Sequence, residues 1–244
     1  MKTRIITGVA MFLAILVIFL INSYVLNFFI LGVVLFLAFN EAAALYGLEN
    51  RKNLAFIALA FYSLAFFTNP VYIAILAILI IVSFLAHVRA ENLNIILPFI
   101  YPAVPVFMIW AVYSEYGLAY LVWLILAVVA SDSGAYFVGK KYGKIPFSKS
   151  SPNKTKEGVL GGLFLGTIIG SMCGYYIIDG IFHVVITSFL ICAFGVWGDL
   201  FESYLKRKAD VKDSGNLLPG HGGMLDRIDG YLFGAPALLW AMSW

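Results

Sequence analysis

Residues 70–87 read PVYIAILAILIIVSFLAH, an apolar run without lysine, arginine, aspartate or glutamate. A helix needs about 20 mostly apolar residues to cross the hydrocarbon layer of a membrane, and this run approaches that length. Of the 244 residues, 62% are hydrophobic and 12% are charged, whereas a soluble domain carries about 25% charged residues. The apolar runs of a very apolar soluble core would be short and periodic. The run at residues 70–87 is neither. We therefore predict an integral membrane protein.

Similar apolar runs recur along the whole chain and predict about nine transmembrane helices. They lie at roughly 5–21, 24–46, 53–68, 70–87, 93–112, 117–138, 158–178, 182–204 and 228–243. The first run follows Lys2 and Arg4, as in a signal peptide, but no small-residue cleavage site follows it, so we interpret it as a retained span. The predicted fold is an all-α, polytopic integral membrane protein.

The polar residues are distributed unevenly along the chain. No linker or internal repeat is visible, so we predict a single membrane domain over residues 1–244. Residues 1–115 have the character of an N-terminal helical scaffold, because their loops are short and their spans contain few polar residues. From Ala130 onward, polar residues occur within and between the spans. Residues 116–244 are therefore the predicted catalytic helical region.

The basic residues predict the orientation, because lysine and arginine are retained on the cytoplasmic side of a membrane. With nine spans and a cytoplasmic N-terminus, all 16 lysine and arginine residues fall in inner segments. These segments are 1–4, 49–53, 87–92, 139–157 and 205–227. The C-terminus then lies outside. We expect a multi-pass protein of the cell inner (plasma) membrane, with its active site facing the cytoplasm.

Several acidic residues lie in or beside the later spans, where burying a charge in the membrane is costly and so points to function. They are Asp132, Asp199, Glu202, Asp226 and Asp229. On a helix, Asp199, Glu202 and Ser203 share one face, because they are three and four residues apart. Carboxylates that converge from two helices either pair with lysine and arginine or bind a hard cation through oxygen. Both explanations stay open at this point.

Two inner loops carry groups that suit phosphate. The loop GKKYGKIPFSKSSPNKTKEG is rich in lysine, and the later one contains Gly215, Gly220, Gly222 and Gly223. Glycines leave backbone amides open to phosphate oxygens. A basic loop can also simply attract anionic lipid, but Pro152 and its polar neighbours predict a specific turn. Carboxylates, lysines and open amides together suggest phosphoryl or nucleotidyl transfer.

The stretch SYLKRKADVKDSGNLLPGHGGMLDRID, from Ser203 to Asp229, resembles the phosphatidate cytidylyltransferases, also called CDP-diacylglycerol synthases. The segments SDSGAYFVGKKYGK and SPNKTKEG are similar to the same family, although the second departs from it at Lys156, where bacterial members often have an aromatic residue. The resemblance covers roughly residues 130–230. It implies that CTP and phosphatidate react to give CDP-diacylglycerol and pyrophosphate.

The resemblance also implies roles for individual residues. Asp199 and Asp226 would be the main Mg²⁺ ligands, with Asp229 assisting, and a second cation is left open. Lys206 and Arg207 would take part in catalysis with these acids. The implied substrate-binding residues are Asp132, Ser151, Lys154, Glu157, Ser203, Lys212, Asp213, His221, Gly222, Gly223 and Arg227. The expected partners are CTP, phosphatidate and membrane lipid, without nucleic acid.

Two other functions stay open. A cytidylyltransferase for another lipid phosphate, such as the archaeal ether-lipid type, would share the motif, although the long N-terminal set of spans favours phosphatidate. A cation-coupled transporter would also place acids in its spans. However, the acids here lie at the predicted cytoplasmic ends of the helices, and no repeat is visible.

One predicted span carries a packing signal. Its glycines Gly162, Gly166, Gly170 and Gly174 recur every four residues. Glycines at this spacing form a smooth helix face that lets another helix approach closely. The partner helix is either within the same chain or in a homodimer.

Overall fold

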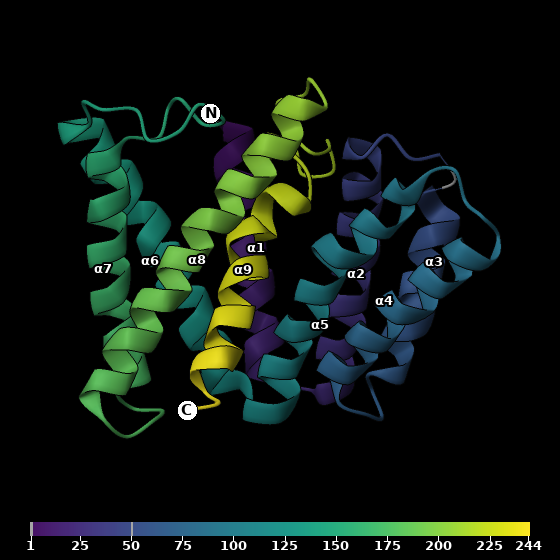
Figure 1. Ribbon diagram of the computed structural model, residues 1–244. Coiled ribbons are helices and arrows are strands. Elements are labelled where there is room, and N and C mark those ends of the chain that lie inside the picture. The colour runs from purple at the N-terminus through teal and green to yellow at the C-terminus, as the bar shows by residue number, and fades with distance from the viewer. Residues whose placement is uncertain (1, 50) are drawn as a thin grey trace. The chain divides into compact units, whose positions relative to one another are not determined.

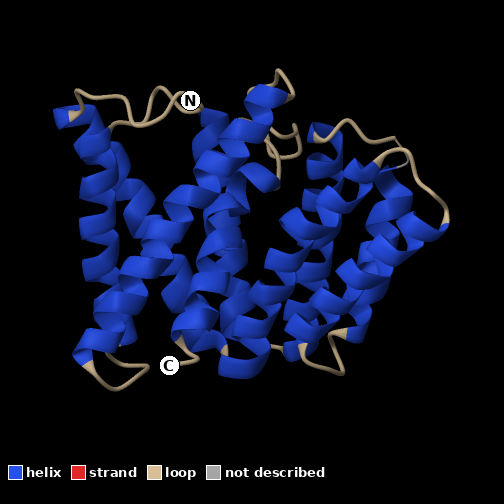
Figure 2. Ribbon diagram, in the orientation of Figure 1, coloured by secondary structure: helices blue, strands red, loops and turns tan. Residues whose placement is uncertain are grey.

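The protein is described by a computed structural model that covers residues 2–49 and 51–244. Met1 and Asn50 lie outside these ranges, as do the side chains of residues 2–5, so the predicted inner segments 1–4 and 49–53 are only partly described. The described part contains helices joined by loops and no β-strand (Figure 2). The all-helical prediction is therefore confirmed.

Each predicted run corresponds to a helical segment (Figure 1). The regular helices are α1 (Lys2–Ile21), α2 (Tyr24–Leu45), α3 (Arg51–Leu64), α4 (Pro70–His87), α5 (Val104–Ala111), α6 (Leu118–Tyr142), α7 (Lys156–Gly174), α8 (Ile181–Lys208) and α9 (Leu225–Ala241). Asn69 caps α4, because its side chain accepts hydrogen bonds from the amides of Val71 and Tyr72. The predicted and observed ends differ by a few residues.

Among the described residues, 6 helical segments are long and apolar enough to cross a membrane. They are Tyr24–Leu45, Pro70–His87, Leu93–Tyr116, Leu118–Tyr142, Lys156–Gly174 and Ile181–Lys208. The helix α1 is apolar over the shorter stretch Ile6–Ile21, whereas α3 has 14 residues and α9 has 17. These segments support a membrane protein, and the count of nine spans stays a prediction.

Prolines make the fifth predicted run irregular. It consists of η1 (Leu93–Ile96), η2 (Phe99–Ala103), α5 and η3 (Val112–Tyr116). Pro102 lies inside η2, and Tyr101 before it has the non-helical angles φ −140° and ψ 113°. Proline lacks an amide hydrogen, and its ring disfavours the helical conformation of the preceding residue. At Tyr101 the chain leaves that conformation, and the regular helix is interrupted.

The helices form two compact units, which we describe separately. The first consists of residues 1–114 and 208–228, and the second of residues 115–207 and 229–244. The glycine-rich segment after α8 thus packs with the N-terminal helices. The predicted catalytic region, 116–244, contributes residues to both units.

An aromatic cluster forms the core of the first unit. Trp110 on α5 is fully buried, and its Nε1 donates a hydrogen bond to the carbonyl of Ala65 at 3.0 Å. Phe28 on α2 stacks on Tyr62 of α3 with 4.5 Å between ring centroids, and Trp110 packs edge-on against Phe28. Aromatic pairs of this kind add stability beyond the area they bury. The cluster fixes α2 against α3 and α5.

In the second unit, α6 and α7 lie side by side through the glycine face of α7 (Figure 1). A Cβ atom on Gly162 would lie 2.5 Å from the carbonyl oxygen of Ser131 on α6, and one on Gly174 would overlap with the Trp123 ring. The glycines therefore allow close contact within the chain. Of the two alternatives for this face, packing inside the chain is confirmed.

We expect Gly162→Ala to lower the thermal unfolding midpoint of the protein in detergent. Alanine normally favours a helix, but its methyl group here would overlap with a backbone oxygen, and overpacking costs about 1–3 kcal/mol. Gly195→Ala in α8 is the matched control, because its Cβ would meet its nearest neighbours at an ordinary 3.6 Å. Equal midpoints for the two variants would contradict close packing at Gly162.

Candidate active site

In the second unit, α8 presents Asp199 and Ser203 on one face, as their spacing predicted. Ser203 Oγ donates a hydrogen bond to Asp199 Oδ1 at 3.3 Å. Lys154, from the loop before α7, forms an ion pair with Asp199 Oδ2. The side chains of Lys154 and Asp199 are each 26% exposed, so a ligand can reach this pair from solvent.

A buried group of carboxyls lies beside this pair. Glu202 is 0% exposed, and its Oε2 accepts a hydrogen bond from Lys206 Nζ at 3.0 Å. The carboxyl of Asp229 on α9 lies within electrostatic range of Glu202, Asp199 and Asp132. A buried carboxyl is tolerated only when it has partners for its charge and its oxygens. Helices α6, α8 and α9 therefore gather acidic groups next to two lysines.

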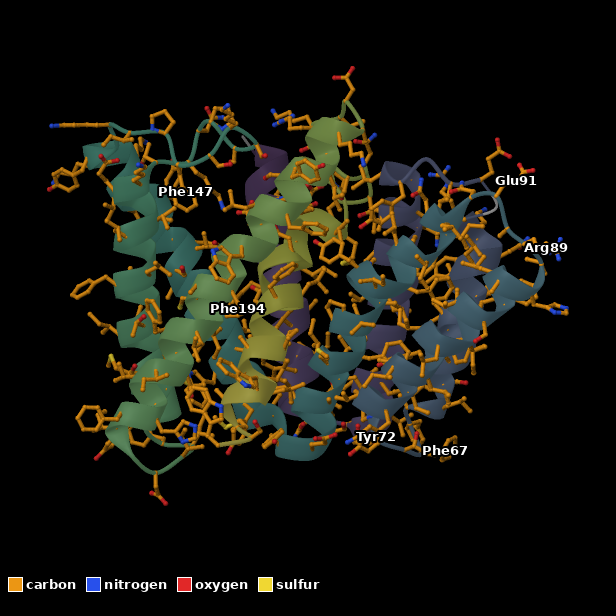
Figure 3. All side chains as sticks on the ribbon, viewed as in Figure 1. Phe67, Tyr72, Arg89, Glu91, Phe147 and Phe194 are labelled. Atoms are coloured by element: carbon orange, nitrogen blue, oxygen red, sulfur yellow. The ribbon has the colours of Figure 1, made fainter. Side chains whose placement is uncertain are left out.

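The loop before α7 positions Lys154 through backbone hydrogen bonds. Phe147, labelled in Figure 3, lies on this loop, and its amide donates to the carbonyl of Lys154 at 2.7 Å. The amide of Lys154 donates to the carbonyl of Ser151 at 3.1 Å, which closes a four-residue turn with Pro152 in its second position. The turn predicted from Pro152 is confirmed.

The other predicted site residues on these elements differ in their surroundings. Glu157 Oε2 accepts hydrogen bonds from the amides of Lys144 at 3.1 Å and Ile145 at 3.3 Å, so it braces the start of the same loop. Asp132 on α6 and Arg207 in the last turn of α8 are exposed. The substrate roles of Ser151, Glu157 and Asp132 and the catalytic role of Arg207 stay predictions.

In the first unit, the glycine-rich loop has a fixed shape. The His221 amide donates to the Leu218 carbonyl at 2.8 Å across Pro219 and Gly220, and the Leu218 amide donates to the Gly222 carbonyl at 2.9 Å. Gly220 has a φ of 78° and Gly222 a φ of 83°, a region that favours glycine. Proline followed by a glycine of positive φ makes a type II turn. The turn fixes the backbone next to His221.

This loop lines an open hollow of about 600 Å³. The lining residues are Lys212, Asp213, Asn216, Leu218, Pro219, Gly220, His221, Gly222 and Arg227. His221 Nδ1 is buried there without a hydrogen-bond partner among the described residues. Lysine, arginine and loop amides are the groups that bind phosphate oxygens in proteins. The structure thus brings together five predicted substrate residues, Lys212, Asp213, His221, Gly222 and Arg227.

Asp226 connects the two ends of the glycine-rich loop through hydrogen bonds. Its Oδ2 accepts hydrogen bonds at 2.8 Å from the Ser214 amide, the Ser214 hydroxyl and the Gly223 amide. Asp226 belongs to the first unit, whereas Asp199 and Asp229 belong to the second. Within the described residues, no three histidine, cysteine, aspartate or glutamate side chains are arranged to hold one ion. The predicted metal site of these three aspartates stays a prediction.

Sequence reasoning missed one acidic residue, Glu41 on α2. Its Oε1 accepts from the Met224 amide at 2.9 Å, and its Oε2 accepts from the Leu225 amide at 2.8 Å and from the Ser214 hydroxyl at 3.0 Å. The signal was present, because Glu41 is an acid inside the predicted span 24–46. The apolar character of the N-terminal half led us to interpret that region as scaffold.

Residues 2–244 match the model of the cytidylyltransferase family. The chain belongs to this family. It is 42% identical over 239 residues to the phosphatidate cytidylyltransferase of Helicobacter pylori strain J99, which covers 97% of this chain and 90% of the relative. It is also similar to the enzymes of the same name from Bacillus subtilis, at 46% identity over 134 residues, and Thermotoga maritima, at 42% over 134 residues. Those matches cover 53% and 51% of this chain, and 49% of each relative.

Membership in the cytidylyltransferase family confirms the resemblance inferred from the motif. It also extends that resemblance, because the motifs cover roughly residues 130–230 whereas the family match begins at residue 2. The N-terminal helices, including α2, thus lie within the region that matches the family.

Proposed function

We propose that this chain is a phosphatidate cytidylyltransferase. It transfers the cytidylyl group of CTP to phosphatidate and yields CDP-diacylglycerol and pyrophosphate, a step of phospholipid biosynthesis. The observation that carries this proposal is the 42% identity, over 97% of the chain, to a relative with that name. The basic hollow around His221 and the carboxyl groups around Asp199 supply chemistry that suits this reaction.

The reaction requires little proton transfer. An oxygen of the phosphatidate phosphate attacks the α-phosphorus of CTP and forms the new phosphoanhydride bond. The bond from the α-phosphorus to the oxygen that bridges to the β-phosphate breaks, and pyrophosphate leaves with that electron pair. The attacking phosphate is already largely ionised near neutral pH, so a dedicated general base is not needed. Catalysis then depends on bringing two anions together and stabilising the leaving group.

Residues of the first unit would hold phosphate groups of CTP. Lys212 and Arg227 would contribute cationic donors, and His221 would add a ring nitrogen. Gly222 and Gly223 would present backbone amides. In the second unit, Lys154, Lys206 and Arg207 would neutralise further phosphate charge, and Ser203 and Asp132 would complete the binding residues there. Charge-assisted hydrogen bonds of this kind are stronger than neutral ones and fix the orientation of a phosphate.

Mg²⁺ prefers oxygen ligands, which the carboxyl groups of this chain would supply. In the second unit, Asp199 and Asp229 belong to a group of acids that includes Glu202 and Asp132 and faces the ammonium groups of Lys154 and Lys206. Asp199 and Asp229 would be ligands, and Asp226 is the third ligand predicted from the sequence. When bound, Mg²⁺ would stabilise negative charge on the phosphates.

We further propose a multi-pass location in the inner (plasma) membrane, with nine spans, a cytoplasmic N-terminus and an external C-terminus. The support is the charge pattern, because all 16 lysine and arginine residues fall in the segments that this topology places inside. The active site then faces the cytoplasm. Phosphatidate would keep its acyl chains in the bilayer while its phosphate reaches the polar groups at the inner surface.

The proposal is tested with the purified protein in lipid–detergent micelles, CTP, Mg²⁺ and either phosphatidate or an ether-linked lipid phosphate. We expect CDP-diacylglycerol, identified by mass spectrometry, from phosphatidate, and no product when Mg²⁺ is removed with a chelator. A product from the ether-linked lipid alone would assign the chain to another lipid substrate. Absence of product from both lipids would overturn the proposed activity.

A further inference from the structure

Glu41 contacts the beginning of α9 from a distant part of the chain. Its carboxylate accepts hydrogen bonds from the amides of Met224 and Leu225, which precede and open that helix. The first amides of a helix have no partner inside the helix, and negative charge is favoured at this end. The α9 terminus is thus capped by a residue on α2, 184 positions away in the case of Leu225.

The glycine-rich loop is built closely around the Glu41 carboxylate. A Cβ atom on Gly215 would lie 2.6 Å from Glu41 Oε1, and one on Gly223 would overlap with Glu41 Oε2 and Ser214 Oγ. At either position a side chain would overlap with the carboxylate, and the loop and the carboxylate would have to separate. The glycines therefore also let the loop wrap around an acid of the N-terminal half.

Ser214 links Glu41 to Asp226. Its hydroxyl lies 3.0 Å from Glu41 Oε2 and 2.8 Å from Asp226 Oδ2, and Asp226 in turn holds the amides of Ser214 and Gly223. A serine hydroxyl has one hydrogen, so Glu41 and Asp226 share this donor, and the loss of any one of the three groups changes the contacts of the other two. Glu41, Ser214 and Asp226 thus form one network that fixes both ends of the loop.

We propose that Glu41 is a positioning residue for CTP. Its carboxylate holds residues 214–225 in the conformation in which Lys212, His221 and Arg227 line the hollow. This inference rests on the proposed function, in which that hollow binds the phosphates of CTP. A separate observation agrees with it, since residues 208–228 form one compact unit with residues 1–114 rather than with the preceding helices.

The test compares Glu41→Gln with Glu91→Gln. Glu91 is an exposed acid after α4 in the same half of the chain, and it is labelled in Figure 3. Glutamine keeps the length of the side chain but turns one acceptor oxygen into a donor that faces other donors. We expect Glu41→Gln to raise the KM for CTP about 10-fold or more, because hydrogen bonds to charged groups are strong. The KM for phosphatidate should stay at the wild-type value, and Glu91→Gln should leave both constants unchanged.

A second readout needs no substrate. Hydrogen exchange of the peptide that contains residues 212–228 should be about 10-fold faster in Glu41→Gln, while exchange in α4 stays as in the wild type. If Glu41→Gln cannot be purified, Ser214→Ala takes its place, with the same direction and a smaller effect. In the double variant, the two effects should be less than additive, because the residues act through one network.

Three results would overturn the inference. They are wild-type kinetics and exchange in Glu41→Gln, equal effects of Glu41→Gln and Glu91→Gln, and a loss of active protein with both KM values unchanged. The last result would show a role in general stability alone. If the wild-type protein makes no CDP-diacylglycerol, the proposed function fails, and the exchange experiment still decides whether Glu41 holds the loop.

Discussion

Replacing Asp226 with asparagine should abolish Mg²⁺-dependent incorporation of CTP into lipid while the protein stays folded in detergent. Asp226 is predicted to bind the metal, and its Oδ2 also holds Ser214 and Gly223. A metal ion contributes several kcal/mol of charge stabilisation, so we expect kcat to fall by about 100-fold or more. The measurement is the rate of CDP-diacylglycerol formation, together with binding of Mn²⁺ in place of Mg²⁺.

The matched control for this variant is Asp210→Asn. Asp210 lies in the same unit, is exposed and has a φ of 54°, a conformation that asparagine also accepts. We expect wild-type turnover and Mn²⁺ binding from this control. Asparagine at position 226 can still accept hydrogen bonds through its own oxygen, so the loop should keep its shape. Normal turnover in Asp226→Asn, or unchanged affinity for Mn²⁺, would contradict the metal role.

Replacing Lys154 with alanine should raise the KM for CTP or phosphatidate and lower kcat/KM by about 10- to 100-fold, since charge-assisted hydrogen bonds to phosphate are strong. The fold should survive, because the ion pair between Lys154 and Asp199 is partly exposed and such pairs contribute little to stability. Steady-state kinetics with each substrate varied in turn measures the effect.

Lys149→Ala separates this role from general attraction to anionic lipid. Lys149 is an exposed lysine of the same loop, so it would share any nonspecific attraction to the membrane surface. We expect its kinetics to match those of the wild type. If Lys149→Ala and Lys154→Ala lower kcat/KM equally, the loop acts through its total charge. The prediction of a specific role for Lys154 would then be wrong.

The helices could be predicted because their cause is local. The apolar run 24–46 predicted α2, which the structure places at Tyr24–Leu45. The run 70–87 predicted α4, which has the same bounds in the structure. Pro152 and its polar neighbours predicted the turn that precedes α7 for the same reason. The irregular passage around Pro102 lies in the predicted run 93–112, and the sequence does not show how the chain continues past that proline.

Contacts between distant residues could not be read from the sequence. The spacing of Asp199 and Ser203 placed them on one face of α8, but the partner of Asp199, Lys154, depends on the folded loop. The same holds for Glu157, whose predicted substrate role is untested: the hydrogen bonds that its carboxylate accepts from the backbone of Lys144 and Ile145 depend on the folded loop.

Glu41 shows the same limit most clearly. Its own span identifies it as a costly charge, but its partners lie near Ser214 and Leu225, far along the chain. A local sequence pattern predicts the depth of such a residue in the membrane and the face of the helix on which it lies. It does not give the segment that folds onto it, because that depends on how α2 packs with residues from the other end of the chain.

Transfer of the cytidylyl group to phosphatidate is tested most directly with CTP labelled on either its α-phosphate or its γ-phosphate. With phosphatidate and Mg²⁺, the α-label should appear in the lipid fraction, and the γ-label should be released as pyrophosphate. Without Mg²⁺, both labels should remain in CTP. A γ-label in the lipid would reveal phosphoryl transfer, and retention of both labels in CTP under complete conditions would exclude the reaction; either result would contradict the account.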